Sequence, residues 1–233
     1  MSSPERCSAW VWPHWPDGCG RFRNDLDPAT VARHVTAFTV TWDYRCPFAR
    51  NAHEHVVEGL RGGADWDVRF VPFSLGQVHV AEGETDVWER PTEDSGLLAL
   101  QTAVVVRDQF PDQFLDTHVA LFALRHDQGR KINDETEVRK VLANSGVDAD
   151  AVFAEIATGT PLAIVRDEHT AAAKDHEVWG VPTFIIGKGA VFVRVMTRPK
   201  DDSALARRTI DRILDLLTGA PELNEFKHTT LQR

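Results

Sequence analysis

Cys46, in the segment WDYRCPFAR, combines a residue type and a position that favour nucleophilic chemistry. It lies where a run of β-branched and aromatic residues gives way to a helical pattern, with Pro47 in the expected first turn. A thiol there meets unpaired backbone N–H groups and the positive end of the helix dipole, which both favour the thiolate. Arg45 and Arg50 flank it and are expected to lower its pKa further. The sequence therefore predicts a reactive thiol, with a small buried structural cysteine as the alternative.

The elements expected around Cys46 are two strands and the helix between them. β-branched and aromatic residues predict a buried strand over 35–42. Apolar residues at helical spacing predict a helix over 46–60, and a second strand is expected over 66–73. Strand, helix and strand at this spacing form a βαβ unit.

The middle of the chain has helical patterns, and strand patterns return only near its end. Helical spacing runs from about 96 to 178, where Asp134 opens a variant capping box. Pro182 stands at the head of a predicted strand in VWGVPTFIIG. Because a proline cannot donate into a strand ladder, it belongs at a strand start or in a cis turn. A hairpin partner strand over 190–195 and a last helix capped by Ser203 complete the predicted order.

These segments together resemble the DsbA-like family of the thioredoxin superfamily. The resemblance covers residues 35 to about 218, where TWDYRCPFA, RFVPFSL, SGLLALQTA, HVALFALRHDQGR and AKDHEVWGVPTFIIG occur in the family's order. It implies an α/β thioredoxin fold (βαβ…ββα) that carries a helical insertion domain. Four parts are then expected: an irregular Trp- and Cys-rich extension at 1–33, a thioredoxin-like domain at 34–83 and 179–220, the helical insertion at 84–178, and a C-terminal tail at 221–233.

The resemblance also implies roles for particular residues. Cys46 matches the attacking thiol of the family. Val181 and Pro182 match the loop that faces this thiol, with a cis bond between them and with the Val181 backbone pairing with an extended substrate. Phe48 and Trp179 are expected to form walls of the site.

One position departs from the family's motif, because Ala49 stands where the second cysteine falls in Cys-Pro-x-Cys. A dithiol enzyme resolves its mixed disulfide with that second thiol, so another group must do so here. An external thiol such as glutathione or mycothiol could resolve the mixed disulfide, or Cys19 or Cys7 could resolve it. The prediction is thus a thiol–disulfide oxidoreductase with the single active-site cysteine Cys46, acting on a small thiol or a protein disulfide. The alternatives are a kappa-type transferase or isomerase that uses glutathione or mycothiol, and a non-catalytic binding protein.

Composition and charge limit the partners. The 233 residues carry a net charge of −9, and their Lys and Arg residues form no basic run, so neither nucleic acid nor a membrane is an expected partner. No apolar stretch approaches the ~18 residues that span a bilayer, and the N-terminus lacks a secretory signal pattern. Three cysteines are too few for a secreted disulfide framework. We therefore expect a cytoplasmic protein, and a homodimer is left open.

Metal and cofactor signals are weak in this sequence. Cys7, His14 and Cys19 lack a fourth ligand and any CxxC knuckle. His53 and His55 are two apart on the predicted helix, so they point in different directions and are interpreted as residues of its surface. No phosphate loop or dinucleotide fingerprint occurs. We expect no metal and no tightly bound cofactor, with glutathione or mycothiol as a co-substrate.

Overall fold

The sheet is built from four short strands. The computed structural model describes residues 35–230. The sheet order is β2-β1-β3-β4, with β1 parallel to β2 and β3 antiparallel to both of its neighbours. The strands are β1 (Thr36–Trp42), β2 (Trp66–Pro72), β3 (Thr183–Ile186) and β4 (Gly189–Phe192). This is the βαβ and ββα order that the sequence predicts.

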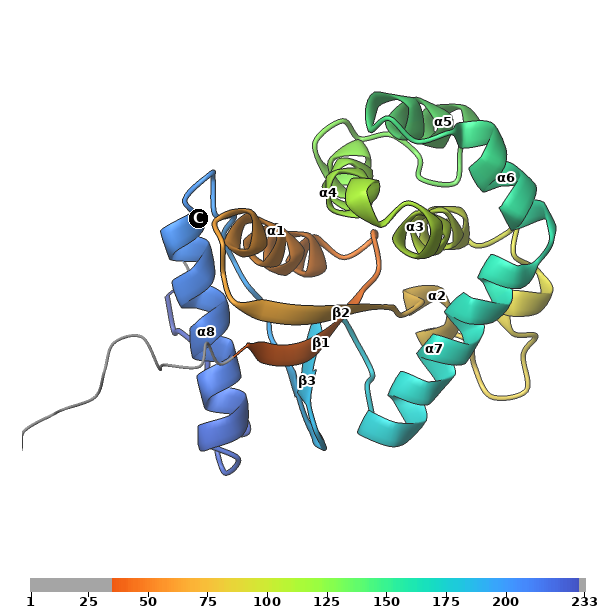
Figure 1. The fold of residues 1–233 in the computed structure, drawn as a ribbon. Coiled ribbons are helices and arrows are strands. Elements are labelled where there is room, and N and C mark those ends of the chain that lie inside the picture. Colours follow the sequence, from red (N-terminus) through yellow and green to blue (C-terminus); the bar gives the residue numbers. More distant parts are fainter. Residues whose placement is uncertain (1–34, 231–233) are drawn as a thin grey trace, which may run out of the picture. The chain divides into compact units, whose positions relative to one another are not determined.

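Helix α1 (Pro47–Arg61) connects the two parallel strands and begins at the position expected for a reactive thiol. Cys46 is its N-cap residue, and Pro47 occupies the first turn, where a missing N–H group costs nothing. Helix α8 (Ser203–Gly219) packs against α1, and both contact the sheet (Figure 1). The cap of α8 differs from the prediction, because the Asp202 side chain, not Ser203, accepts the hydrogen bond from the Leu205 N–H group.

The chain between β2 and β3 is helical, as the sequence predicts. Its elements are α2 (Leu75–Val78), the short 3₁₀ helix η1 (Val87–Glu89), α3 (Leu97–Gln109), α4 (Pro111–His126), α5 (Glu135–Asn144), α6 (Ala149–Ala157) and α7 (Thr160–His176). Helix α3 contacts α4, α6 and α7, and buries residues on nearly all of its faces (Figure 1). Asp134 caps α5 by accepting hydrogen bonds from two backbone N–H groups, as its place in the sequence predicts.

The predicted strand 190–195 is too long, because β4 ends at Phe192. The Val193 N–H group still donates to the Pro182 carbonyl at 3.2 Å, but the chain then leaves the sheet and runs along α1. There the Asn51 side chain donates to the Val195 carbonyl at 2.9 Å. A helix side chain therefore takes over from the strand ladder, which no pattern within residues 190–195 could reveal.

One buried apolar cluster joins the sheet to the helices that follow β2. It includes Val40 and Phe184 from the strands, Leu100 and Phe122 from α3 and α4, and Ile210 from α8. None of the helices in the described part of the chain is long and apolar enough to cross a membrane. The expected extension at 1–33 and the last three residues of the expected tail lie outside the described residues.

Candidate active site around Cys46

The Cys46 sulfur lies where the start of α1 meets the loop before β3. Its Sγ accepts a hydrogen bond from the Ala49 N–H group at 3.4 Å and donates one to the Val181 carbonyl at 3.2 Å. The Val181–Pro182 peptide bond is cis, and the Val181 side chain is buried. Cys46 is partly exposed and is the single cysteine among residues 35–230. Two segments far apart in sequence thus position one accessible thiol.

The sign of the Cys46 pKa shift is opposite to the prediction. Burial raises the pKa of the Cys46 thiol above its ordinary value, and the nearby Asp43 carboxylate raises it further. The N–H groups of Ala49 and Phe48 and the charge of Arg194 act in the lowering direction but do not outweigh burial. The prediction of a lowered pKa is therefore wrong. The helix N-terminus is in place, but the thiol is too desolvated for it to dominate.

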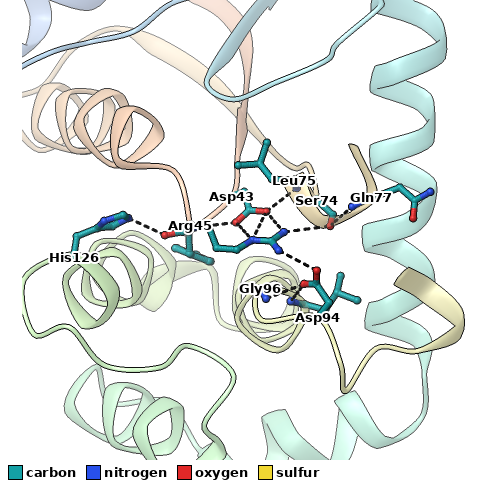
Figure 2. A network of polar contacts seen from close by, with 10 residues as sticks. Asp43, Arg45, Ser74, Leu75, Gln77, Asp94, Gly96 and His126 are labelled. Carbon is teal, nitrogen blue, oxygen red and sulfur yellow. Dashed lines mark hydrogen bonds and ion pairs between the residues drawn. The ribbon is translucent and has the colours of Figure 1, made fainter. Parts of the chain in front are cut away.

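Arg45 does not support the thiolate, because its charge is already neutralised. Figure 2 shows its guanidinium between two carboxylates, at 2.6 Å from Asp43 Oδ2 and 2.9 Å from Asp94 Oδ2. The Asp43 side chain is fully buried, so this pair is held away from solvent. The thiolate-supporting role predicted for Arg45 is corrected: the residue immediately before the thiol is a structural anchor.

The Arg45 ion pairs also hold the first turns of two helices. Asp43 Oδ2 accepts the Leu75 N–H group at the start of α2, at 2.8 Å. Asp94 Oδ1 accepts the N–H groups of Gly96 and Leu97 at the start of α3, at 2.8 and 3.0 Å (Figure 2). The loop that carries Cys46 is therefore tied to the start of α2 directly by Asp43 and to the start of α3 through the Arg45 guanidinium and Asp94.

Two glycines leave room for this guanidinium. A Cβ atom at Gly96 would lie 2.6 Å from Arg45 Nε, and one at Gly76 would overlap the Asp94 carboxylate. Any side chain at either position would therefore displace a member of the buried network.

Arg50 is likewise paired with carboxylates. It contacts Glu54 at 3.0 Å and Asp127, and Arg198 contacts the same two carboxylates at 2.5 and 3.5 Å. The positive charges of two arginines and the negative charges of two carboxylates cancel in this group, which lies at the surface beside α1. The thiolate-supporting role predicted for Arg50 is corrected for the same reason as that of Arg45.

A chain of buried hydrogen bonds links α1 to α4 behind the site. His53 Nε2 lies 3.0 Å from the Thr41 carbonyl, His118 Nε2 lies 2.9 Å from His53 Nδ1, and the Tyr44 hydroxyl lies 2.7 Å from His118 Nδ1. The carbonyl can only accept, so His53 donates from Nε2 and accepts at Nδ1 when neutral. The same rule makes His118 a donor at Nε2 and Tyr44 a donor to His118. Every group in the chain is satisfied in one arrangement.

Burial keeps this chain uncharged. It lowers the pKa of His53 to about 4 and that of His118 well below its ordinary value, and it raises the pKa of Tyr44 well above its own. The interpretation of His53 and His55 as surface residues is wrong, since they are 0% and 1% exposed. Helix α1 is covered on several sides, and His55 Nε2 donates to the Thr197 carbonyl at 3.0 Å.

Three aromatic side chains and one arginine form a group of contacts that includes Phe48 in the first turn of α1. Trp179 is 64% exposed, and its ring lies 4.5 Å from that of Phe192. The Arg194 guanidinium lies 5.7 Å from the Phe48 ring centre and 6.0 Å from that of Phe192. The roles of Phe192 and Arg194 were missed from sequence. The alternation in AVFVRV could have indicated them, because residues two apart lie on one face of an extended chain.

A family model for the DSBA-like thioredoxin domain matches residues 39–200. The chain belongs to this family. Its fold class is therefore confirmed, and the matched region runs from β1 through all of the intervening helices to the segment after β4. No curated protein matches the chain significantly.

Solved structures share the fold of this DSBA-like domain at low sequence identity. A 2-hydroxychromene-2-carboxylate isomerase is 14% identical, with a TM-score of 0.56 over 77% of this chain and 97% of its own. The cytosolic disulfide reductase DsbM from Pseudomonas aeruginosa, solved with GSH, is 15% identical, with a TM-score of 0.53 over 77% of this chain and 100% of its own. A putative protein disulfide isomerase from Nitrosomonas europaea is 11% identical, with a TM-score of 0.55 over 78% and 98% of the two chains.

The DSBA-like site brings together most of the residues singled out in the sequence. Cys46, Phe48 and Ala49 lie at the start of α1, and Val181 faces them across the sulfur. Cys7 and Cys19 lie outside the described residues. Within residues 35–230, no group of His, Cys, Asp and Glu side chains could hold a metal ion.

Proposed function

We propose that this DSBA-like domain is a thiol–disulfide oxidoreductase that works with one active-site cysteine, Cys46. The observation that carries the proposal is the position of its sulfur, between the first N–H groups of α1 and the Val181 carbonyl. Ala49 is fully buried beside it and cannot supply a second thiol. The resolving thiol is then an external one, such as glutathione or mycothiol, or else Cys19 or Cys7.

The reaction proceeds by two thiol–disulfide exchanges. The Cys46 thiolate attacks one sulfur of a disulfide, so that a Cys46–substrate disulfide forms and the other half leaves as a thiolate. A second thiolate then attacks the substrate sulfur of this mixed disulfide. It forms the product disulfide and returns Cys46 as a thiolate. The substrate disulfide and the resolving thiol supply all the electrons and protons that the cycle needs.

The raised pKa of Cys46 favours reduction of disulfides over donation of a disulfide to a substrate. A strongly oxidising active site depends on a stabilised thiolate, and here burial disfavours the thiolate. A thiol of high pKa is also a poor leaving group, so release of Cys46 from its mixed disulfide is slow and depends on an excess of the resolving thiol. We therefore propose that Cys46 receives groups from mixed disulfides and passes them to small thiols. Donation of disulfides to folding proteins is not the proposed role.

The Val181 carbonyl couples thiol ionisation to substrate binding. In the resting site it accepts the Cys46 S–H group. When the proton leaves, this carbonyl loses its donor and can accept an N–H group from an extended substrate, as an added strand would supply. The substrates included in this proposal are low-molecular-weight disulfides and protein mixed disulfides. A cytoplasmic location stays a prediction.

Intact-mass measurement tests the proposal on a variant with Cys7→Ser and Cys19→Ser, which retains Cys46 alone. Glutathione disulfide should add one glutathione, and excess reduced glutathione should remove it. The matched control adds Cys46→Ser and should stay unmodified. The rate of adduct formation should rise with pH between 7 and 9, because the pKa of the thiol is raised. An absent adduct would contradict the proposal. An adduct that neither an external thiol in this variant nor Cys7 and Cys19 in the unaltered chain releases would contradict it too, and would favour a binding protein.

One observation favours a second candidate, a kappa-type transferase or isomerase that uses a bound small thiol. The Cys46 thiol donates a hydrogen bond to the Val181 carbonyl, which is a role that a serine hydroxyl can fill. The variant Cys46→Ser separates the two candidates. An oxidoreductase loses all turnover of disulfides, whereas a transferase or isomerase retains turnover with glutathione or mycothiol.

A further inference from the structure

Four side chains form what we call the aromatic–arginine surface: Phe48, Trp179, Phe192 and Arg194. They come from the first turn of α1, the loop before β3, the end of β4 and the segment after it. The Trp179 and Phe192 rings lie 4.5 Å apart, and the Arg194 guanidinium lies within 6.0 Å of the centres of both phenylalanine rings. The surface therefore offers flat apolar groups and one cation beside the thiol.

Backbone contacts on both sides hold Arg194 in position. The preceding residue donates to the Pro182 carbonyl at 3.2 Å, which fixes this segment to the loop that faces Cys46. The following residue, Val195, is buried and accepts a hydrogen bond from Asn51 at 2.9 Å. The loop before β3 and helix α1 thus fix the backbone position of Arg194, although its side chain is exposed.

Arg194 differs from the other arginines near the thiol in its partners. Arg45, Arg50 and Arg198 all contact carboxylates, as described above. Arg194 contacts only aromatic rings and makes no ion pair with any described residue of the chain. It also lies close enough to Cys46 for its charge to act on the sulfur, in the lowering direction. This charge is therefore available to an anionic ligand that reaches the thiol.

We infer that Arg194 is a specificity residue that binds the carboxylate of a small anionic thiol, or of its disulfide, while the ligand's sulfur meets Cys46. This inference rests on the proposed function and names its substrate class. Trp179 and Phe192 would cover the carbon chain of the same ligand. A carboxylate-bearing thiol such as glutathione fits this arrangement, whereas an uncharged thiol such as mycothiol leaves Arg194 without a partner.

Two alkylating agents of nearly equal size test this inference without requiring turnover. Iodoacetate carries a carboxylate and iodoacetamide is neutral, and with both the Cys46 sulfur forms a bond to carbon as iodide leaves. In the variant that retains Cys46 alone, Arg194→Gln should lower the rate ratio of iodoacetate to iodoacetamide by about two- to fivefold. Arg194→Lys should retain part of the ratio. The ratio in the parent should fall as salt is added, since the charge is exposed.

Arg166→Gln is the matched control, because it makes the same change of net charge at an exposed position of α7, where Arg166 pairs with Asp167. It should leave the ratio unchanged. If Arg194→Gln slows both reagents equally, Arg194 acts on the thiol and not on the ligand, and the inference is overturned. An unchanged ratio overturns it as well. Failure to form or release the glutathione adduct, with charge selectivity intact, would count against the proposed function alone.

Discussion

At the scale of single residues, the network around Arg45 leads to a prediction about Gly96. A Cβ atom there would lie 2.6 Å from Arg45 Nε, inside a network that also holds the buried Asp43 carboxylate. Gly96→Ala should therefore lower the free energy of unfolding by about 1–3 kcal/mol, because the guanidinium must shift from its partners. Urea unfolding followed by circular dichroism measures this change.

Gly219→Ala is the control for that prediction. No atom lies within 4 Å of a Cβ added at Gly219, which is the last residue of α8. Its effect should stay within about 0.5 kcal/mol, or be stabilising because alanine favours the helix. Equal destabilisation by the two substitutions would show that the loss arises from removing a glycine and not from the Arg45 network.

The sequence predicted where Cys46 lies but not how its pKa shifts. Its place before a helix can be read from residues 35–60 alone, and the cis bond before Pro182 was expected from the family resemblance. The pKa depends on how much protein covers the sulfur, which is set by segments 135 residues apart. The pairing of Arg45 with Asp94 was missed for the same reason, because Asp94 is 49 positions away.

At the scale of elements, the buried hydrogen-bond chain between α1 and α4 makes stability depend on pH. Burial lowers the pKa of His53 to about 4, whereas the unfolded chain has an ordinary value near 6.5. Below pH 6.5 the unfolded state therefore binds more protons than the folded state, and stability falls as the pH falls. The loss should run from about pH 6.5 to 4 and be on the order of 3 kcal/mol for His53 alone.

Urea midpoints between pH 4 and 8 check this dependence. His53→Met should lower stability at pH 7 by about 1–3 kcal/mol, because His118 loses its acceptor, but should make the acid loss shallower. Part of the slope should persist, since His118 and His169 also have lowered pKa values. His79→Asn, at an exposed position, is the control and should leave the slope as it is. A parent whose stability is constant down to pH 4 would contradict the prediction.

The elements themselves were largely predictable, and their environments were not. Helix α1 follows from an apolar stripe and its cap, and the helices after β2 follow from periodicity. Periodicity assigns one buried face to a helix, however, and α1 packs against both α4 and α8. His53 is buried against His118 of α4, and His55 contacts the segment after β4 at Thr197. The predicted end of β4 was wrong because the Asn51 side chain of α1 binds the backbone at Val195.

At the scale of the whole molecule, the continuous core leads to a prediction about folding. Buried residues of the sheet, such as Val40 and Phe184, belong to the same cluster as Leu100 of α3 and Leu142 of α5. The Arg45 network adds a polar connection between the same two regions. We therefore expect the thioredoxin-like part and the helical part to unfold in one cooperative transition.

Hydrogen exchange measured by mass spectrometry through a urea titration checks this expectation. Peptides from α1 and from α5 should lose protection at the same urea concentration, and tryptophan fluorescence should change together with them. Separate midpoints would contradict this expectation. They would instead support the proposal that residues 84–178 form a domain that unfolds independently. The order of elements follows from the sequence, but the sharing of one core could not, since it depends on contacts between distant segments.

The hydrogen bond from Cys46 to the Val181 carbonyl has a consequence for the resting protein. Peroxides oxidise thiolates far faster than thiols, and burial raises the pKa of the Cys46 thiol and so disfavours its thiolate. Loss of the thiol proton frees one of the two lone pairs of this carbonyl, so under the proposed function a docked strand and an ionised sulfur favour each other. The sulfur is therefore least vulnerable to irreversible overoxidation while it waits for substrate.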